Sequence, residues 1–138
     1  SIEGYSNIID ITSDSIDTQV LLYQADVLMT DYSGCYYDYL LLDRPIIYYA
    51  YDLEEYLRKQ RNMYFNYMDH IVGPLCKQKE EVEVSLNKYF ANGLKDFDQK
   101  RNSLRDKYYS VDNQKEVREK IYLFIKSKIF KEENIWKE

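Results

Sequence analysis

The sequence predicts an α/β fold with a parallel sheet, because short strand-like runs alternate with helical segments. Three runs have strand composition, residues 7–11, 26–30 and 45–50. The third is almost continuously apolar, as expected of a strand covered on both faces. Strand, helix and strand at this spacing imply right-handed crossovers, so we expect the strands to lie parallel in one sheet.

Helical spacing is expected in the segments between and just after these strands. Residues 16–23 follow the first strand, and Ile16, Val20 and Tyr23 can share one face of a helix. Residues 33–42 form a second predicted helix, which ends at Asp43-Arg44-Pro45 because proline disfavours helix at the residue before it. Residues 52–60 are expected to form a short third helix, with Asp52 as its cap.

The second half of the chain is predicted to be mainly helical. Residues 61–74 form an irregular loop, of a length that is usually functional or mobile. Helices are expected over 79–91, stopped by Asn92-Gly93, and over 95–108 and 114–129. The last carries an apolar stripe, which we expect to pack against the sheet, with a membrane-surface role as the alternative. The stripe consists of Val117, Ile121, Phe124, Ile125 and Lys128.

Length and composition describe one globular domain. The chain has 138 residues, 45% of them apolar and 31% charged, and no apolar run approaches the length of a transmembrane helix. It also lacks the basic and apolar segments of a signal peptide. Because it has no initiator methionine, begins near a predicted strand and is small for a two-substrate enzyme, we expect a fragment of a longer protein.

Charge and rare residues exclude several function classes. The net charge of −5 argues against a general nucleic-acid binder. Up to Leu94 there are 7 basic and 15 acidic residues, and from Lys95 onward 12 basic and 9 acidic, so the C-terminal part is basic. A solvated helix face explains this, with contact to an anionic membrane surface as the alternative. Two cysteines without metal-ligand spacing fit a reduced, cytoplasmic setting.

The carboxyl ends of the predicted strands are the expected position of a ligand site. The second strand runs into Thr30, Asp31, Tyr32, Ser33 and Gly34, where small residues open a helix. Free backbone N–H groups at such a helix start can bind an anion. A plain turn capped by Ser33 explains the same pattern, and the local sequence leaves both interpretations open.

Other residues have both a structural and a functional interpretation. Asp31 can orient a substrate hydroxyl, bind a metal, or simply hydrogen-bond the loop backbone. Arg61 is the best cation for a phosphate, because its planar fork can hold two oxygens, although many such arginines are surface residues. His70 is the only histidine, so a histidine pair or a histidine-rich metal site is excluded, and we expect it to be structural. Cys35 is expected to pack.

An ordered series of four sequence blocks resembles the CDP-glycerol glycerophosphotransferases of teichoic acid synthesis. The blocks are residues 25–34 (ADVLMTDYSG) with Tyr37-Asp38, 44–49 (RPIIYY), 51–56 (YDLEEY) and 61–67 (RNMYFNY), with Gly73-Pro74 where the family has PGP. The resemblance implies a GT-B-type enzyme. This chain would then be its C-terminal half-domain, with a Rossmann-like donor-binding core over 1–76 and a helical segment over 77–138.

The resemblance also implies roles for particular residues. The segment Thr30 to Gly34, with Ser33 at its helix start, would hold the donor's diphosphate. Arg61 would neutralise phosphate charge, and Asp52 would lie near the polyol. The implied donor is CDP-glycerol or another CDP-polyol, the acceptor is a polymer or lipid-linked chain, and the family's catalytic histidines lie upstream of this segment. No metal ligand, no certain cofactor and no nucleic-acid partner is expected.

Two departures from the family pattern stand in these blocks. Gly34 replaces a serine, which removes a hydroxyl but keeps an N–H, and Asn62 replaces a glycine. The implied location is cytoplasmic, peripheral on the inner face of the plasma membrane, with the missing N-terminal half as a partner. A GT-B-like domain with another nucleotide donor, such as CDP-ribitol, and a non-catalytic binding module of the same fold remain the alternatives.

Overall fold

The computed structural model describes residues 4–12, 15–59, 65–109 and 114–132. The chain divides into two compact units, Ser1–Arg105 and Asp106–Glu138, and each is described by itself. The predicted boundary between residues 76 and 77 stays a prediction. Arg61 and Asn62 lie outside the described residues.

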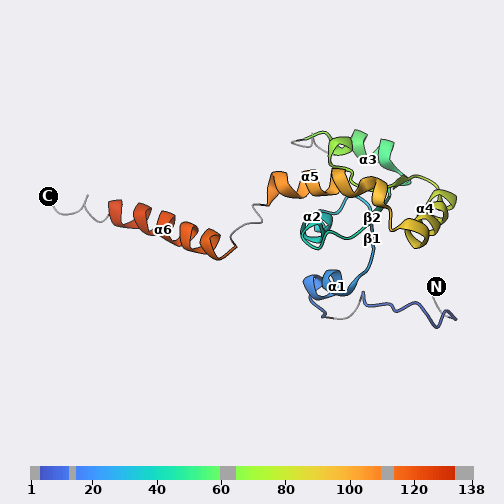
Figure 1. Ribbon diagram of the computed structural model, residues 1–138, viewed down its shortest axis with the longest axis horizontal. Helices are drawn as coiled ribbons and strands as arrows, with labels where there is room; N and C mark the ends of the chain where they lie inside the picture. The colour runs from blue at the N-terminus through green and yellow to red at the C-terminus, as the bar shows by residue number, and fades with distance from the viewer. Residues whose placement is uncertain (1–3, 13–14, 60–64, 110–113, 133–138) are drawn as a thin grey trace. The chain divides into compact units, whose positions relative to one another are not determined.

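A small parallel sheet forms the centre of the first unit (Figure 1). Its strands are β1 (Leu28–Thr30), β2 (Ile46–Tyr49) and β3 (Leu75–Cys76), in the order β1-β2-β3. Leu28 lies opposite Ile46 in the first pair, and Tyr48 opposite Leu75 in the second. The predicted α/β fold, a partial parallel sheet with helices after it, is therefore confirmed.

The prediction of which segments supply the strands was right for two of three. Residues 7–11 are not a strand, and the side chains of Ile8 and Ile9 are 45% and 82% exposed. The third strand is β3 instead, whose two residues pair with Tyr48 and Tyr49. A strand this short has no composition signal of its own, because it forms only through pairing with its neighbour.

Three short helices accompany the first two strands: α1 (Thr18–Gln24), α2 (Cys35–Leu40) and α3 (Leu53–Lys59). Asp17 caps α1, because its Oδ1 accepts a hydrogen bond from the Gln19 N–H at 2.8 Å. The face expected to be shared on this helix is not the buried one. Ile16, Val20 and Tyr23 are all exposed, and α1 buries Leu22 instead.

The later elements match the predicted helices closely. Helices were expected where the structure has α4 (Lys79–Asn92), η2 (Lys95–Phe97) with α5 (Asp98–Tyr108), and α6 (Gln114–Glu132). The 3₁₀ turn η1 (Tyr67–His70) lies instead in the segment 61–74 that was expected to be an irregular loop. Gly93 ends α4 in the left-handed region at φ 70°, as the Asn-Gly pair predicts. In α6 the side chains of Val117, Ile121, Phe124 and Ile125 are exposed, so their packing on the sheet stays a prediction.

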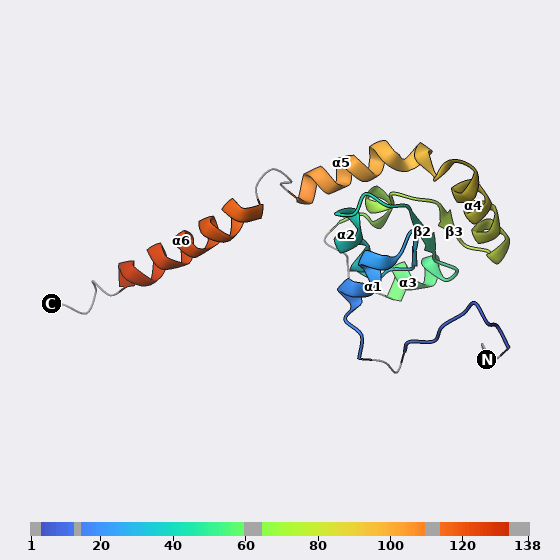
Figure 2. The same ribbon diagram turned by 60° about the horizontal axis from the view of Figure 1, so that its bottom comes forward.

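The core lies around β2, as expected from the continuous apolar run that forms it. Ile46, Ile47 and Tyr48 are buried, and α4 packs against β2 and β3 (Figure 2). A side chain at Gly73 would place its Cβ 1.8 Å from the carbonyl oxygen of Ile46. The approach of the chain to β2 just before β3 therefore requires glycine.

Within the part of the chain that the structure describes, no helix combines the length and the apolar character needed to cross a membrane.

Candidate functional site

Polar residues follow all three strands on the carboxyl edge of the sheet. Asp31 to Gly34 come directly after β1, Tyr51 and Asp52 after β2, and Lys77 and Gln78 after β3. Because the strands are parallel, these three turns leave the sheet at the same edge. Ligands of open α/β sheets bind at that edge, so the expected location of the site is occupied by suitable polar groups.

The turn after β1 is held by its own side chains. Asp31 Oδ1 accepts a hydrogen bond from the Ser33 N–H at 3.1 Å, and Ser33 Oγ accepts one from the Cys35 N–H at 3.4 Å. Gly34 is the N-cap residue of α2, and Thr30 Oγ1 lies 3.7 Å from Cys35 Sγ. Asp31 thus has the loop-stabilising contact that was one of its predicted roles. The backbone N–H of Ser33 already has an intramolecular acceptor here.

Tyr32 connects this turn to the turn after β2. Its hydroxyl donates a hydrogen bond to Asp52 Oδ1 at 2.7 Å, and its ring stacks on Tyr56 with centroids 3.6 Å apart and planes 9° from parallel. Burial, and then the bond to Asp52, raise the pKa of Tyr32, so the phenol remains a proton donor at neutral pH. The predicted site residues on these two turns are therefore brought together by one side chain.

A second tyrosine ties the same turn to η1. The hydroxyl of Tyr67 donates to the backbone carbonyl of Asp31 at 3.1 Å, and its ring centroid lies 5.7 Å from that of Tyr32. Burial raises the pKa of Tyr67, which likewise keeps this donor protonated. Tyr67 and Tyr56 were not among the predicted site residues, although both stand in the sequence blocks that carry the resemblance.

An open hollow lies beside Asp52. Its volume is about 530 Å³, and its lining comes from the turns after β2 and β3 and from the start of α3. Those residues are Tyr51, Asp52, Leu53, Glu54, Glu55, Lys77 and Gln78. Lys77 and Gln78 gave no signal in the sequence, because the two-residue strand that places them could not be recognised.

Asp52 occupies the expected cap position before α3, and its side chain makes a further contact. It lies just before α3 and its backbone carbonyl accepts from the Tyr56 N–H, but its Oδ1 is engaged by Tyr32. Among the described residues, no group of three or more potential metal ligands is found. The role of Arg61 stays a prediction because the residue lies outside the described ranges.

His70 is buried among aromatic rings. Its Nδ1 is hydrogen-bonded to the hydroxyl of Tyr37, and Phe65 stacks on the imidazole with centroids 4.1 Å apart. The side chain is 2% exposed. These contacts agree with the expectation that His70 is a structural residue.

Comparison with known proteins decides the family. The sequence profile of the CDP-Glycerol:Poly(glycerophosphate) glycerophosphotransferase family matches residues 2–127. This chain belongs to that family. The family was expected from the sequence blocks around TDYSG, and the expectation is confirmed.

Relatives of this chain include polymerases for two polyols. The chain is 32% identical over 114 residues to the teichoic acid poly(glycerol phosphate) polymerase of Staphylococcus epidermidis. This match covers 83% of this chain and 16% of the relative. It is 45% identical over 62 residues to the teichoic acid poly(ribitol-phosphate) polymerase of Bacillus spizizenii, covering 45% of this chain and 10% of that protein.

Solved structures give the same assignment. The wall teichoic acid polymerase TagF matches with a TM-score of 0.72 and 32% identity, over 94% of this chain and 32% of TagF. A TagF variant soaked with CDPG matches with a TM-score of 0.71 at the same identity, over 93% of this chain and 32% of that one. This chain thus spans about a third of the solved relative.

Proposed function

We propose that this chain is the C-terminal donor-binding portion of a CDP-glycerol, or CDP-polyol, phosphotransferase. The intact enzyme transfers polyol phosphate to a growing teichoic-acid-like or capsular polymer and releases CMP. The observation that carries the proposal is the contact of Tyr32 with Asp52 in a chain of this family. That contact unites the two turns whose sequence blocks imply donor binding, on the edge of the sheet where ligands bind.

The proposed division of labour follows the chemistry of a nucleoside diphosphate. Thr30, Asp31, Tyr32, Ser33 and Gly34 form the cradle for the diphosphate, since this turn carries hydroxyl and N–H donors. Arg61 neutralises phosphate charge, and Asp52 lies near the polyol. Stabilisation of charge on the transferring phosphoryl group is the main catalytic requirement in such reactions.

The proposed reaction is a displacement at the donor's β-phosphorus. An acceptor hydroxyl oxygen forms a new bond to this phosphorus, and the bond from phosphorus to the bridging oxygen breaks, so that CMP leaves. The hydroxyl proton passes to a base outside this chain, which we expect to be an upstream histidine.

The polyol remains to be chosen between two candidates, because the relatives' names include both glycerol-phosphate and ribitol-phosphate polymerases. Action at the cytoplasmic face of the plasma membrane, with the basic C-terminal part near anionic lipid and a lipid-linked acceptor, belongs to the same proposal.

Calorimetry on the intact protein tests the donor class. CDP-glycerol, CDP-ribitol, CMP and UDP-sugars are titrated in turn, and a cytidine nucleotide is expected to bind most tightly. Binding of UDP-sugars at equal or higher affinity would reject the donor assignment. The tighter of the two CDP-polyols identifies the polyol.

Arginine variants test the phosphate role with a matched control. Arg61→Ala is expected to weaken CDP-glycerol binding by about tenfold or more, since a charge-assisted contact is worth about 1.5–3 kcal/mol. Arg58→Ala, which removes an exposed arginine from the last turn of α3, is expected to leave the affinity within about twofold. Equal affinities for the two variants would return Arg61 to a surface role.

A further inference from the structure

The hollow beside Asp52 has the position and size of a ligand subsite. It lies beyond the ends of β2 and β3, next to the turn after β1 that is proposed to hold the diphosphate. Its volume of about 530 Å³ falls within the range of small-molecule sites. A donor whose phosphates lie at the end of β1 therefore has room for an adjoining group over β2 and β3.

The charges of the hollow disfavour a second phosphate. Asp52, Glu54 and Glu55 supply three carboxylates, against the ammonium group of Lys77. A phosphate there would be repelled by this excess of negative charge. Hydroxyl groups suit the same lining, because each can donate to a carboxylate and accept from an ammonium or an amide.

The polar groups of the hollow are held in place from outside it. Asp52 Oδ1 is fixed by the hydroxyl of Tyr32, which is itself stacked on Tyr56. On the other side, Glu81 Oε2 accepts the backbone N–H groups of Lys77 and Gln78 at 2.6 and 3.0 Å. Both turns are thus fixed before any ligand binds, which lowers the cost of ordering them.

Lys77 can exchange its present partner for a ligand at small cost. Its Nζ lies 3.0 Å from Glu54 Oε1, in a pair whose side chains are 46% and 89% exposed. Exposed ion pairs of this kind contribute about 0–1 kcal/mol. A ligand hydroxyl can therefore accept a hydrogen bond from the Lys77 ammonium group without the loss of a strong contact within the protein.

We propose that this hollow binds the hydroxyl groups of the donor, through Asp52, Lys77 and Gln78. The proposal rests on the proposed donor-binding function and adds a subsite to it. The hydroxyls belong either to the polyol or to the ribose, and the two sources are separated by comparing CDP-glycerol with CDP, which has the ribose but no polyol.

The test uses the intact protein, with Asp52→Asn and Lys77→Met measured by calorimetry against both ligands. Loss of a charge-assisted hydrogen bond is expected to weaken CDP-glycerol binding by about tenfold in each variant. If CDP binding stays within about twofold, the polyol occupies the hollow; if both ligands weaken equally in both variants, the ribose does. Lys77→Gln, which keeps a donor, is expected to retain part of the affinity.

Matched controls separate the subsite from general charge effects. Glu83→Gln is the control for Asp52→Asn, and Lys79→Met is the control for Lys77→Met. Both control residues are exposed on α4, and neither lines the hollow. Both controls are expected to bind CDP-glycerol like the unaltered protein. Thermal melting of every variant checks that the fold is kept.

Two results would overturn the subsite. One is unchanged affinity for both ligands in Asp52→Asn and Lys77→Met. The other is tighter CDP binding in Asp52→Asn together with weaker CDP binding in Lys77→Met. A phosphate in the hollow would give this result, because it gains from the loss of a carboxylate and loses from the removal of an ammonium group. Failure of the proposed function is distinguishable, since the unaltered protein would then not bind CDP-glycerol at all.

Discussion

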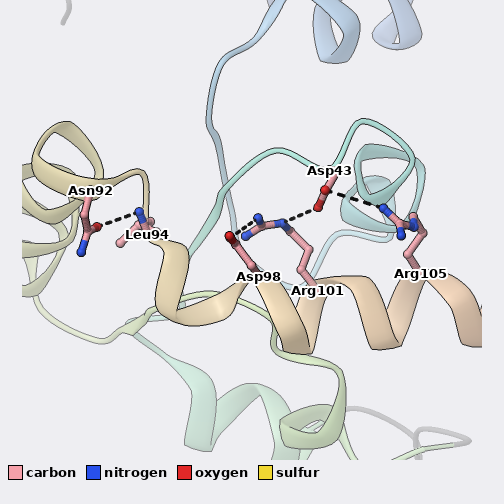
Figure 3. A network of polar contacts seen from close by, with 6 residues as sticks. All are labelled: Asp43, Asn92, Leu94, Asp98, Arg101 and Arg105. Carbon is pink, nitrogen blue, oxygen red and sulfur yellow. Dashed lines mark hydrogen bonds and ion pairs between the residues drawn. The ribbon is translucent and has the colours of Figure 1, made fainter.

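The two ends of the small sheet are stabilised by different chemistry. At the carboxyl end, Tyr32 and Tyr67 hold the turns by stacking and by hydrogen bonds, and Asp31 and Ser33 stay exposed. At the amino end, Arg101 is 4% exposed and lies between Asp43 and Asp98 (Figure 3). Aromatic supports thus leave polar groups available to a ligand, whereas the buried guanidinium uses its own charge to join elements.

The ionic end joins segments far apart in sequence. Arg101 Nε donates to Asp43 Oδ1 at 3.2 Å and its NH2 group to Asp98 Oδ1 at 2.6 Å, while Arg105 lies 3.7 Å from Asp43 Oδ2. Asp43 stands in the turn between α2 and β2 with φ of 51°, a left-handed value that aspartate tolerates. The network therefore fixes α5 to the turn that leads into the central strand.

The largest expected effect is that of a side chain at Gly73, near the amino end of the sheet. Gly73→Ala places a Cβ 1.8 Å from the oxygen and 2.8 Å from the carbon of the Ile46 carbonyl. We expect the free energy of unfolding to fall by about 3 kcal/mol or more, or the protein to fail to fold, because the backbone at Ile46 or Gly73 must move. Gly34→Ala at the carboxyl end has nothing within 4 Å and should change the free energy of unfolding by less than about 0.5 kcal/mol.

Chemical denaturation of the two glycine variants measures this difference. Similar stability of Gly73→Ala and Gly34→Ala would show that the amino end of the sheet is as adaptable as the turn after β1.

The next effect concerns the buried charge. Arg101→Met removes the guanidinium and is expected to lower the free energy of unfolding by about 2 kcal/mol. This is less than the roughly 3–5 kcal/mol of a broken buried pair, because both aspartates are 46% exposed and can be hydrated. Lys59→Met, which breaks the exposed pair with Glu55, is the matched control and should cost less than about 0.5 kcal/mol. Urea unfolding of both variants gives the comparison, and equal losses would contradict a structural role for the network.

A smaller effect is expected at the aromatic end. Tyr32→Phe keeps the stacking on Tyr56 but loses the hydrogen bond to Asp52, which should cost about 1 kcal/mol. Tyr23→Phe, which removes the hydroxyl of a tyrosine that is 69% exposed on α1, serves as the control. Urea unfolding measures the loss of stability, and calorimetry on the intact protein measures donor affinity. If Tyr32→Phe loses more free energy of donor binding than free energy of unfolding, the tyrosine positions the binding turn as well as stabilising it.

The smallest effect is a pH dependence at the start of α4. The backbone N–H of Lys77, followed by that of Gln78, lowers the pKa of Glu81 from its usual 4.5. A lowered folded-state pKa adds stability above the unfolded value, and this is lost as pH falls through the folded value. The melting temperature of Glu81→Gln should therefore lie below that of the parent protein at neutral pH and converge with it as the pH falls below the lowered pKa of Glu81. A constant difference across this range would exclude the linkage.

Much of the first unit could be predicted from local sequence. β1 and β2 follow from apolar and β-branched runs, and α4 ends where Asn92-Gly93 predicts. The location of the candidate site at the carboxyl edge of the sheet could also be predicted, because parallel strands place the residues that follow them on one edge. The strand expected over 7–11 was wrong because a short apolar run does not itself supply a pairing partner.

The candidate site was predicted only in part. Thr30 to Gly34 and Asp52 were named from sequence, and Tyr32 joins their two turns. Tyr56 and Tyr67 were missed as supports, since stacking and a bond to a distant carbonyl depend on the fold. Lys77 was missed because β3 exists only by pairing with β2.

The sequence by itself determined the fold class and the family and singled out the turn that is proposed to hold an anion, because these depend on local composition and on ordered blocks of residues. Only the tertiary structure decided which side chains support that turn, that Asp52 accepts from Tyr32, and that a hollow opens beside it. The physical reason is range: propensity acts over a few neighbours, whereas Tyr32 and Asp52 are 20 residues apart and meet only when the strands pair.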